Sequence, residues 1–281
     1  MKRALGRATS AGLAQALSIV ALATALGARS ARSDEPPLRV CADPNDLPYS
    51  NSAQEGFENK IARLVAGALH RPLEFVWRPQ RRGFVREGLN AGECDLVAAI
   101  PSGAPMALTT RPYYRSTYVF VSKAGEPPVS SFDDPSLKTR TIGVQLVGDN
   151  GMNSPPAHAL AERGIVENVR GFMVYGDYRD DHPLSEIVHA VATGKVDVAA
   201  VWGPVAGYFA VREKPPLVVT AIAGNPEARL PMTFDIAMGV RRTDKALKTE
   251  VDSALSSLAP QIRTILASYG VPVMWETPID R

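Results

Sequence analysis

Two segments about a hundred residues apart repeat one local pattern, and this repeat limits the fold more than any other feature of the chain. Residues 87–99 read EGLNAGECDLVAA, and residues 189–201 read HAVATGKVDVAAV. Each runs from a helix end through a glycine turn and an aspartate into an apolar strand. A near-continuous apolar run is typical of a strand covered on both faces, as in a parallel sheet. The sequence therefore predicts an α/β protein with one copy of this unit in each of two lobes.

Strands and helices alternate around the first copy. We expect strands at residues 38–42, 73–77 and 95–100, with helices from Phe57 and at residues 84–89. The first helix has apolar residues at helical spacing, namely Phe57, Ile61, Leu64, Val65, Ala68 and Leu69. Right-handed crossovers place these strands in one parallel sheet. The loop of residues 43–51 then follows a strand at its carboxyl end, where open α/β sheets bind ligands.

The second half of the chain begins after a proline-rich break at residues 125–128, which is typical of a linker. Residues 109–115 are expected to form a loop before a strand at 118–122. We expect further strands at 141–145, 172–175, 196–201, 215–221 and 234–240, and helices at 157–163, 183–193 and 244–269, the last interrupted near Pro260. The tail from Gly270 is expected to cross the first lobe. The predicted lobes are 38–122 with 232–281, and 123–231.

Residues 1–33 have the three-part pattern of a bacterial secretory signal. A basic head precedes the small-residue apolar run 11–26, and cleavage is expected between Ala28 and Ser33. The alternative is a membrane anchor, but the run is short of the ~20 residues that a span needs. No cysteine follows it to carry a lipid, so the processed chain is expected to be exported to the periplasm without membrane insertion.

Removal of this leader changes the charge balance. The leader holds five of the 31 basic residues and no acidic one, which leaves 26 basic against 29 acidic residues. No basic tract predicts a nucleic-acid partner. Two cysteines in an exported chain favour a disulfide between Cys41 and Cys94. Their positions along neighbouring strands argue against it, because bridged Cα atoms usually lie within ~7 Å, and both possibilities stay open.

Several motifs together resemble a known family. The opening strand and Pro-Tyr loop, AGECDLVAA (91–99), PYYRS (112–116) and TGKVD (193–197) resemble the type II periplasmic solute-binding proteins of the amino-acid-binding kind. RVCADPNDLP (39–48), GFENKIA (56–62), WRPQRRGF (77–84) and RPYYRS (111–116) resemble the binding-protein-like partners of quinoprotein alcohol dehydrogenases, the MxaJ/XoxJ-type proteins of methanol oxidation. The resemblance implies two α/β lobes joined by a two-segment hinge.

The same resemblance implies a periplasmic location and partners. The expected partner is a PQQ-dependent alcohol dehydrogenase with its c-type cytochrome. PQQ then belongs to the partner enzyme, and this chain itself is expected to bind no cofactor.

The chain departs from the amino-acid-binding pattern at two positions. That family uses an arginine shortly after the third strand to hold the ligand carboxylate in a bidentate pair, but residues 102–108 contain none. It also uses a second-lobe aspartate for the ligand ammonium, and the matching position here lies near Trp202. Ordinary amino-acid capture is therefore not expected.

The candidate cleft residues follow the predicted strand ends or flank the hinge. Each has a plainer interpretation: Asp43 as a turn former, the paired arginines as a solvated face, and the paired tyrosines as hinge packing. The candidate ligand or partner cleft consists of Asp43, Asn45, Tyr49, Trp77, Gln80, Arg81, Arg82, Ser102, Tyr113, Tyr114, Arg115, Gln145 and Trp202.

No sequence pattern predicts catalysis or a metal site. The four histidines are dispersed, and no nucleophile motif is present. Two functions from different classes remain. One is an accessory partner that aids maturation or activation of the dehydrogenase, and the other is a transport receptor for a small polar ligand other than an ordinary amino acid. Pull-down of the dehydrogenase, or a ligand-induced thermal shift, distinguishes them.

Overall fold

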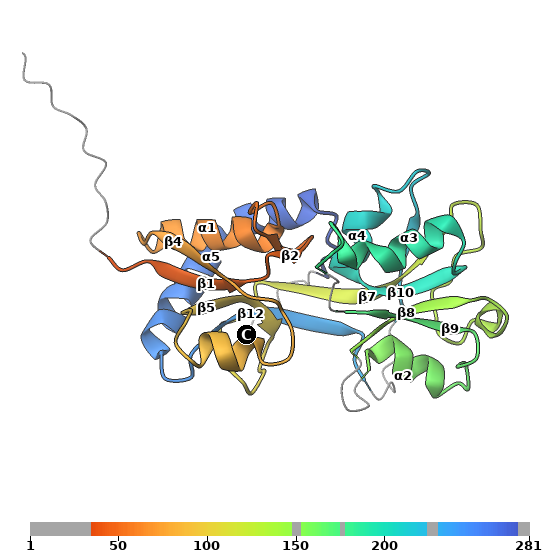
Figure 1. Cartoon of the computed structure of the whole chain (residues 1–281), viewed down its shortest axis with the longest axis horizontal. Coiled ribbons are helices and arrows are strands. Elements are labelled where there is room, and N and C mark those ends of the chain that lie inside the picture. Colours follow the sequence, from red (N-terminus) through yellow and green to blue (C-terminus); the bar gives the residue numbers. More distant parts are fainter. Residues whose placement is uncertain (1–34, 148–152, 175–177, 224–229, 275–281) are drawn as a thin grey trace, which may run out of the picture. The chain divides into compact units, whose positions relative to one another are not determined.

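A mixed sheet runs through the part of the chain that the structure describes (Figure 1). The structure is a computed structural model that describes residues 35–147, 153–174, 178–223 and 230–274. The strand order is β4-β1-β5-β12-β7-β10-β8-β9, with β11 paired to β7 and β6 paired to β12. Residues 33–281 form one compact unit, and the predicted leader, residues 1–33, lies outside the described residues.

The first lobe contains the predicted parallel strands. Strand β1 pairs in parallel with β4 and β5, and β12 closes the group antiparallel to β5. The elements are β1 (Leu38–Ala42), β2 (Asn45–Asp46), β3 (Ser50–Asn51), α1 (Phe57–Ala68), β4 (Leu73–Trp77), the π-helical turn η1 (Phe84–Leu89), β5 (Leu96–Pro101), β6 (Leu108–Thr109), β12 (Thr233–Val240) and α5 (Lys245–Ser268).

The second lobe repeats the arrangement. Strands β8, β9 and β10 are parallel, while β11 pairs antiparallel with β7. The elements are η2 (Pro135–Lys138), β8 (Ile142–Leu146), α2 (Pro155–Ala161), β9 (Val169–Met173), η3 (Pro183–Ser185), α3 (Glu186–Thr193), β10 (Val198–Trp202), α4 (Gly203–Ala210) and β11 (Val218–Ala221).

Strand β7 (Tyr114–Ser122) belongs to both lobes. Its residues Tyr114–Thr117 pair with β12, and its residues Tyr118–Ser122 pair with β10 and β11. One long strand therefore crosses between the lobes, and β12 supplies the second crossing segment (Figure 1). The predicted lobe boundaries themselves remain a prediction.

Alternate residues of the strands pack into different cores, which explains the continuous apolar runs. In the first lobe Val40 packs with α1 and α5, whereas Cys41 packs with η1 on the other face. In the second lobe Val201 packs with α3 and α4, and Ala200 packs with α2. Figure 1 shows α3 and α4 on one side of this part of the sheet and α2 on the other. Both sheet faces are thus covered, as a parallel sheet requires.

The loop between β1 and α1 is fixed by backbone contacts. The amide of Gly56 donates to Asn59 Oδ1 at 3.2 Å, and a side chain at Gly56 would lie 2.0 Å from the carbonyl oxygen of Tyr49. Only glycine fits this approach, so the loop packs tightly onto the start of α1. This packing holds β2 and β3 over the end of the first strand.

Three predicted elements differ from the structure. The predicted loop 109–115 was too long, because strand β7 already begins at Tyr114. Residues Tyr114–Thr117 belong to the strand because they pair with β12. Helix α5 runs through Pro260 without a break, because buried residues before and after it pack on the same core. Helix α4 was not predicted, because it is buried on nearly all sides and shows no polar face.

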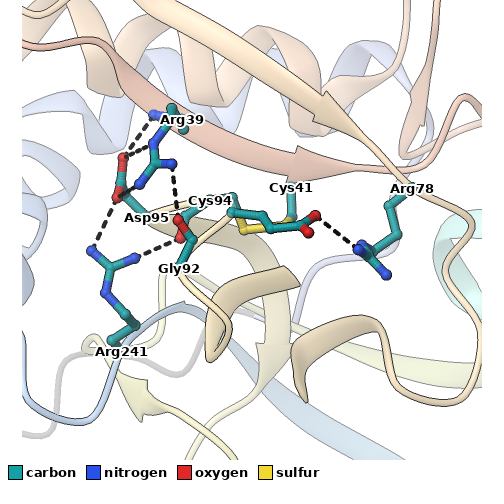
Figure 2. The surroundings of a disulfide bond; sticks show 8 residues. Arg39, Cys41, Arg78, Gly92, Cys94, Asp95 and Arg241 are labelled. Atoms are coloured by element: carbon teal, nitrogen blue, oxygen red, sulfur yellow. Dashed lines mark hydrogen bonds and ion pairs between the residues drawn. A yellow bond between two sulfur atoms is a disulfide. The ribbon is translucent and has the colours of Figure 1, made fainter. Parts of the chain in front are cut away.

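The two cysteines form a disulfide with Cα atoms 5.5 Å apart. The objection from strand position was wrong, because the turn of residues 88–94 lies directly beside β1, so that a side chain at Gly88 would lie 2.6 Å from Cys41 Sγ. The amides of Glu93 and Cys94 both donate to the carbonyl of Gly88, at 3.0 and 3.5 Å, which folds this turn beside β1. Figure 2 shows the bridge next to Asp95.

Asp95 lies between two arginines. Arg39 donates from Nη2 to Asp95 Oδ1 at 2.7 Å, and Arg241 Nη2 donates to the same oxygen at 3.0 Å (Figure 2). Burial acts to raise the pKa of Asp95, but these hydrogen bonds outweigh it and hold the pKa below its usual value. The repeated aspartate of the sequence motif thus ties β1, β5 and the residue after β12 together.

Among the helices of the described ranges, none combines the length and the apolar character needed to cross a bilayer.

Candidate functional site

A cavity of about 330 Å³ lies where the two lobes meet. Its volume falls at the lower end of the range for small-molecule sites. The described residues that line it are Asp46, Tyr49, Glu58, Gln80, Ala99, Ile100, Pro101, Tyr114, Tyr118, Gln145, Val174, Leu184, Trp202, Val205, Phe234 and Ile236.

Strand ends and the crossing strands position this lining. Pro101 ends β5, Gln145 lies near the end of β8, and Trp202 ends β10. The carboxyl ends of parallel strands are where open α/β sheets bind ligands. Tyr114 and Tyr118 come from β7, the strand that both lobes share.

Three aromatic rings form one wall of the cavity. The centroid of Trp202 lies 5.1 Å from that of Tyr118 and 5.8 Å from that of Phe234. Tyr118 and Phe234 are 6.5 Å apart, and all three pairs meet edge to face. The backbone amide of Trp202 also donates to Gln145 Oε1 at 2.9 Å, which fixes its approach to the cavity.

Two carboxyl groups of the first lobe line the same cavity as the aromatic rings. Asp46 comes from β2 and Glu58 from the first turn of α1. Burial raises the pKa of Glu58 to about 8, with a further contribution from Asp43. Burial, Asp43 and Glu58 together raise the pKa of Asp46 well above its usual value.

The charges that line the cavity are all acidic. Among the described lining residues there is no lysine, arginine or histidine. A ligand carboxylate therefore meets no cationic partner there, in agreement with the arginine missing from residues 102–108.

A second set of residues joins the lobes beside the cavity. The hydroxyl of Tyr178 donates to Asp43 Oδ2, and Asn45 Nδ2 donates to the carbonyl of Asp180 at 2.7 Å. The Arg81 guanidinium lies 5.1 Å from the centre of the Tyr178 ring. Asp43 also accepts from the amide of Gln80 at 2.5 Å. The loop after β1 is therefore held against the second lobe.

The structure separates the predicted site residues into three groups. Five of them line the cavity: Tyr49, Gln80, Tyr114, Gln145 and Trp202. Three lie at the contact between the lobes, namely Asp43, Asn45 and Arg81. The remaining five are outside the lining: Trp77, Arg82, Ser102, Tyr113 and Arg115. The part that any of them plays in binding stays a prediction.

The residues outside the lining have other contacts. Tyr113 donates from its hydroxyl to the carbonyl of Ala98 at 3.0 Å, and Arg115 pairs with Asp235 at 2.6 Å. Trp77 stacks on Phe75 at 5.1 Å. These contacts fit the plainer interpretation of packing and pairing along the strands.

Eleven of the 16 described lining residues were not predicted, and four of these carry acidic or aromatic side chains, for which one sequence signal was available. Glu58 sits in the first turn of a helix, where a carboxylate normally compensates the helix dipole, so it was not considered. Asp46 follows Asp43 in the opening loop, and two acids three residues apart in a predicted cleft loop were the usable signal. Tyr118 and Phe234 lie within strands, and only the lobe arrangement brings them to the cavity.

Comparisons with known proteins identify the family. Residues 38–270 match the model of the bacterial extracellular solute-binding proteins, family 3. The chain belongs to this family. The match spans both lobes, so the two-lobe α/β fold with its shared strands is that of a type II binding protein.

Within family 3 the chain is similar to a small set of named proteins. It is 35% identical to Protein MoxJ of Methylorubrum extorquens over 90% of this chain and 86% of that protein. A crystal structure of MxaJ from Methlophaga aminisulfidivorans has a TM-score of 0.74 at 29% identity, covering 84% of this chain and 100% of that one. The periplasmic binding protein XoxJ from Methylobacterium extorquens has a TM-score of 0.70 at 34% identity, covering 85% and 100%.

More distant solved structures share only the fold of this family 3 member. An ancestral cationic amino acid solute-binding protein has a TM-score of 0.64 at 20% identity and covers 83% of the chain. The family fold is thus kept between proteins that are only about 20% identical.

Proposed function

We propose that this chain is a periplasmic accessory protein of a PQQ-dependent alcohol dehydrogenase system, and that it aids maturation or activation of the enzyme. The observation that carries this is the similarity to MoxJ, MxaJ and XoxJ over nearly the whole length of both partners in each comparison. The motifs at residues 39–48, 56–62, 77–84 and 111–116 are the ones that resemble partners of quinoprotein dehydrogenases.

The chemistry of the cavity supports a binding role. Its lining is mainly aromatic and aliphatic, with two carboxyl groups and two side-chain amides. Such a set recognises a ligand or holds the lobes in one arrangement. We accordingly assign this chain no catalytic step and leave alcohol oxidation to the partner.

We place PQQ in the partner enzyme. PQQ carries several carboxylates, and the charged groups among the described lining residues are Asp46 and Glu58. No described lining residue offers the carboxylates of PQQ a cationic partner, which disfavours its binding in this cavity. We therefore propose that the chain acts on the dehydrogenase without carrying its PQQ, and that the enzyme's c-type cytochrome belongs to the same system.

The test uses the organism that encodes the chain. Deletion of the gene is expected to abolish dye-linked alcohol dehydrogenase activity in the periplasmic fraction, and a copy on a plasmid is expected to restore it. The tagged chain is expected to retain the dehydrogenase from the same fraction.

Two results would contradict the proposal. One is unchanged dehydrogenase activity in the deletion strain together with no retained enzyme. The other is retention of a permease and its ATPase instead, which supports the transport receptor.

A further inference from the structure

We propose that the cavity between the lobes binds a small organic cation that has no carboxylate, such as an alkylammonium or quaternary ammonium compound. This goes beyond the role of dehydrogenase partner, because it assigns the cavity a ligand class of its own. It rests on the charges, the burial and the aromatic surface of the cavity.

Asp46 is a nearly buried residue whose carboxyl faces the cavity. The residue is 9% exposed, and its side chain makes no hydrogen bond or ion pair within the described part of the chain. Buried charged groups are normally paired, because an unpaired one is costly. The missing partner is therefore expected to come from a ligand.

Glu58 supplies a second carboxyl to the same space. Its side chain likewise has no hydrogen-bond partner among the described residues, and its charge acts on Asp46. Burial raises the pKa of both groups, so in the empty cavity they favour the protonated form. A bound cation lowers the pKa of both carboxyl groups and so favours their ionised form. The ionised carboxylates then attract the cation, and the protein supplies no other cationic partner for them among the described lining residues.

The aromatic wall selects an organic cation. Trp202, Tyr118 and Phe234 contact one another edge to face, and all three line the cavity. Cations are attracted to the faces of such rings, and quaternary ammonium groups are recognised in aromatic cages. An alkylammonium group satisfies the acids and the rings together.

Three other ligand classes fit less well. A metal ion needs several oxygen, nitrogen or sulfur ligands, and the described residues contain no group of three acids, histidines or cysteines that could hold one. An anion meets two carboxyl groups and no cationic partner among the described lining residues. An amino acid brings a carboxylate, and no arginine or lysine lines the cavity in the described residues to receive it.

The test measures binding to the chain purified from periplasm, by calorimetry and by thermal shift. The two expected ligands are choline and propylammonium. Glycine betaine is the comparison for choline, and β-alanine and 1-propanol are the comparisons for propylammonium. Choline and betaine share the quaternary ammonium group, while betaine adds a carboxylate. We expect the two carboxylate-free cations to bind and the zwitterions and the alcohol to bind at least roughly tenfold more weakly.

Isosteric variants locate the site. Asp46→Asn and Glu58→Gln are each expected to weaken cation binding by roughly tenfold or more, because each removes a charge-assisted contact. Glu162→Gln is the matched control, because this glutamate is exposed at the C-cap of α2 and does not line the cavity. It is expected to bind as the parent does.

The proposal is overturned if no cation of the set produces heat or a thermal shift at millimolar concentration. It is equally overturned if betaine binds as well as choline. The comparison of probes on the parent chain does not depend on whether a variant folds, and none of these outcomes depends on the presence of a dehydrogenase.

Discussion

Glu58 gives the free protein an unusual pH dependence at the scale of one residue. Because its pKa in the folded chain is about 8, it holds a proton there at pH values where the unfolded chain has lost it. The folded state binds more protons between about pH 4.5 and pH 8, so stability falls as pH rises through this window. Burial and the charge of Asp43 raise the pKa of Glu58, and the charge of Glu58 in turn raises the pKa values of Asp46, Tyr49, Tyr113 and Tyr114.

Glu58→Gln removes this dependence. As pH rises from 5 to 8, the free energy of unfolding of the variant is expected to become about 1–2 kcal/mol higher than that of the parent. This is less than the full pKa shift implies, because water in the cavity offsets part of the effect of burial. Urea unfolding at several pH values measures it. If the free energy of unfolding depends on pH in the same way for parent and variant, the prediction is wrong. Asp46 titrates in the same direction, so a shallower slope is expected to remain in the variant.

Asp95 is expected to behave in the opposite way, because its pKa in the folded chain is lowered. Its contribution is present above the unfolded value and is lost as pH falls through the folded one. Asp95→Asn leaves Arg39 and Arg241 facing an amide, at a cost of about 2–4 kcal/mol at pH 7. The difference between variant and parent is expected to shrink below about pH 4.

The control for Asp95 is an exposed ion pair. Asp133 pairs with Arg163 at 2.7 Å, but its side chain is 70% exposed. Such pairs contribute about 0–1 kcal/mol, so Asp133→Asn is expected to change the urea midpoint little. If both variants lose the same stability, the argument from burial of Asp95 fails.

The disulfide acts at the scale of elements, since it joins β1 to the turn before β5 across 53 residues of sequence. Closing a loop of this length restricts the unfolded chain, and its removal is expected to cost about 3–4 kcal/mol. The double variant Cys41→Ser with Cys94→Ser is compared with the parent by urea unfolding. Reduction of the parent is expected to give the same loss, and a loss only in the double variant would instead indicate poor packing of serine in the core.

Elements with their own periodicity were predictable from the sequence, and elements defined by partners were not. Helix α1 was expected from its first residue because its apolar spacing is local. Strand β7 was expected too short, because Tyr114–Thr117 become strand only by pairing with β12. Helix α4 was missed because burial on all sides removes the polar face that marks a helix.

The same distinction applies to the site. The loop after β1 and the end of β10 were predicted from strand ends, and the structure places Tyr49 and Trp202 on the cavity. The rings of Tyr118 and Phe234 reach it from the two crossing strands, a juxtaposition that exists only when both lobes are assembled. The charge of the cavity was predicted only in part, from the absence of arginine after Ser102.

At the scale of the whole molecule, contacts on two sides hold the lobes together. Near the cavity, Tyr178 donates to Asp43 and Asn45 donates to the Asp180 carbonyl. Elsewhere Gly207 of α4 meets Gly270, the residue that follows α5 and its C-cap, so closely that a side chain at Gly207 would lie 1.8 Å from the Gly270 oxygen. Binding proteins of this type move by hinge closure, so the first pair of contacts decides how far the cavity is closed.

Removing the cavity-side contacts is therefore expected to open the lobes. Each hydrogen bond contributes about 0.5–1.5 kcal/mol, so Tyr178→Phe with Asn45→Ala shifts the balance toward the open form by roughly tenfold. X-ray scattering is expected to give a larger radius of gyration, and amides of residues 43–51 are expected to exchange faster. Asn90→Ala is the control, because its amide donates to Met106 within the first lobe at 3.1 Å. An unchanged radius and unchanged exchange would mean that the Gly207–Gly270 side fixes the lobes by itself, and the cavity would then be a preformed site that closes on no ligand.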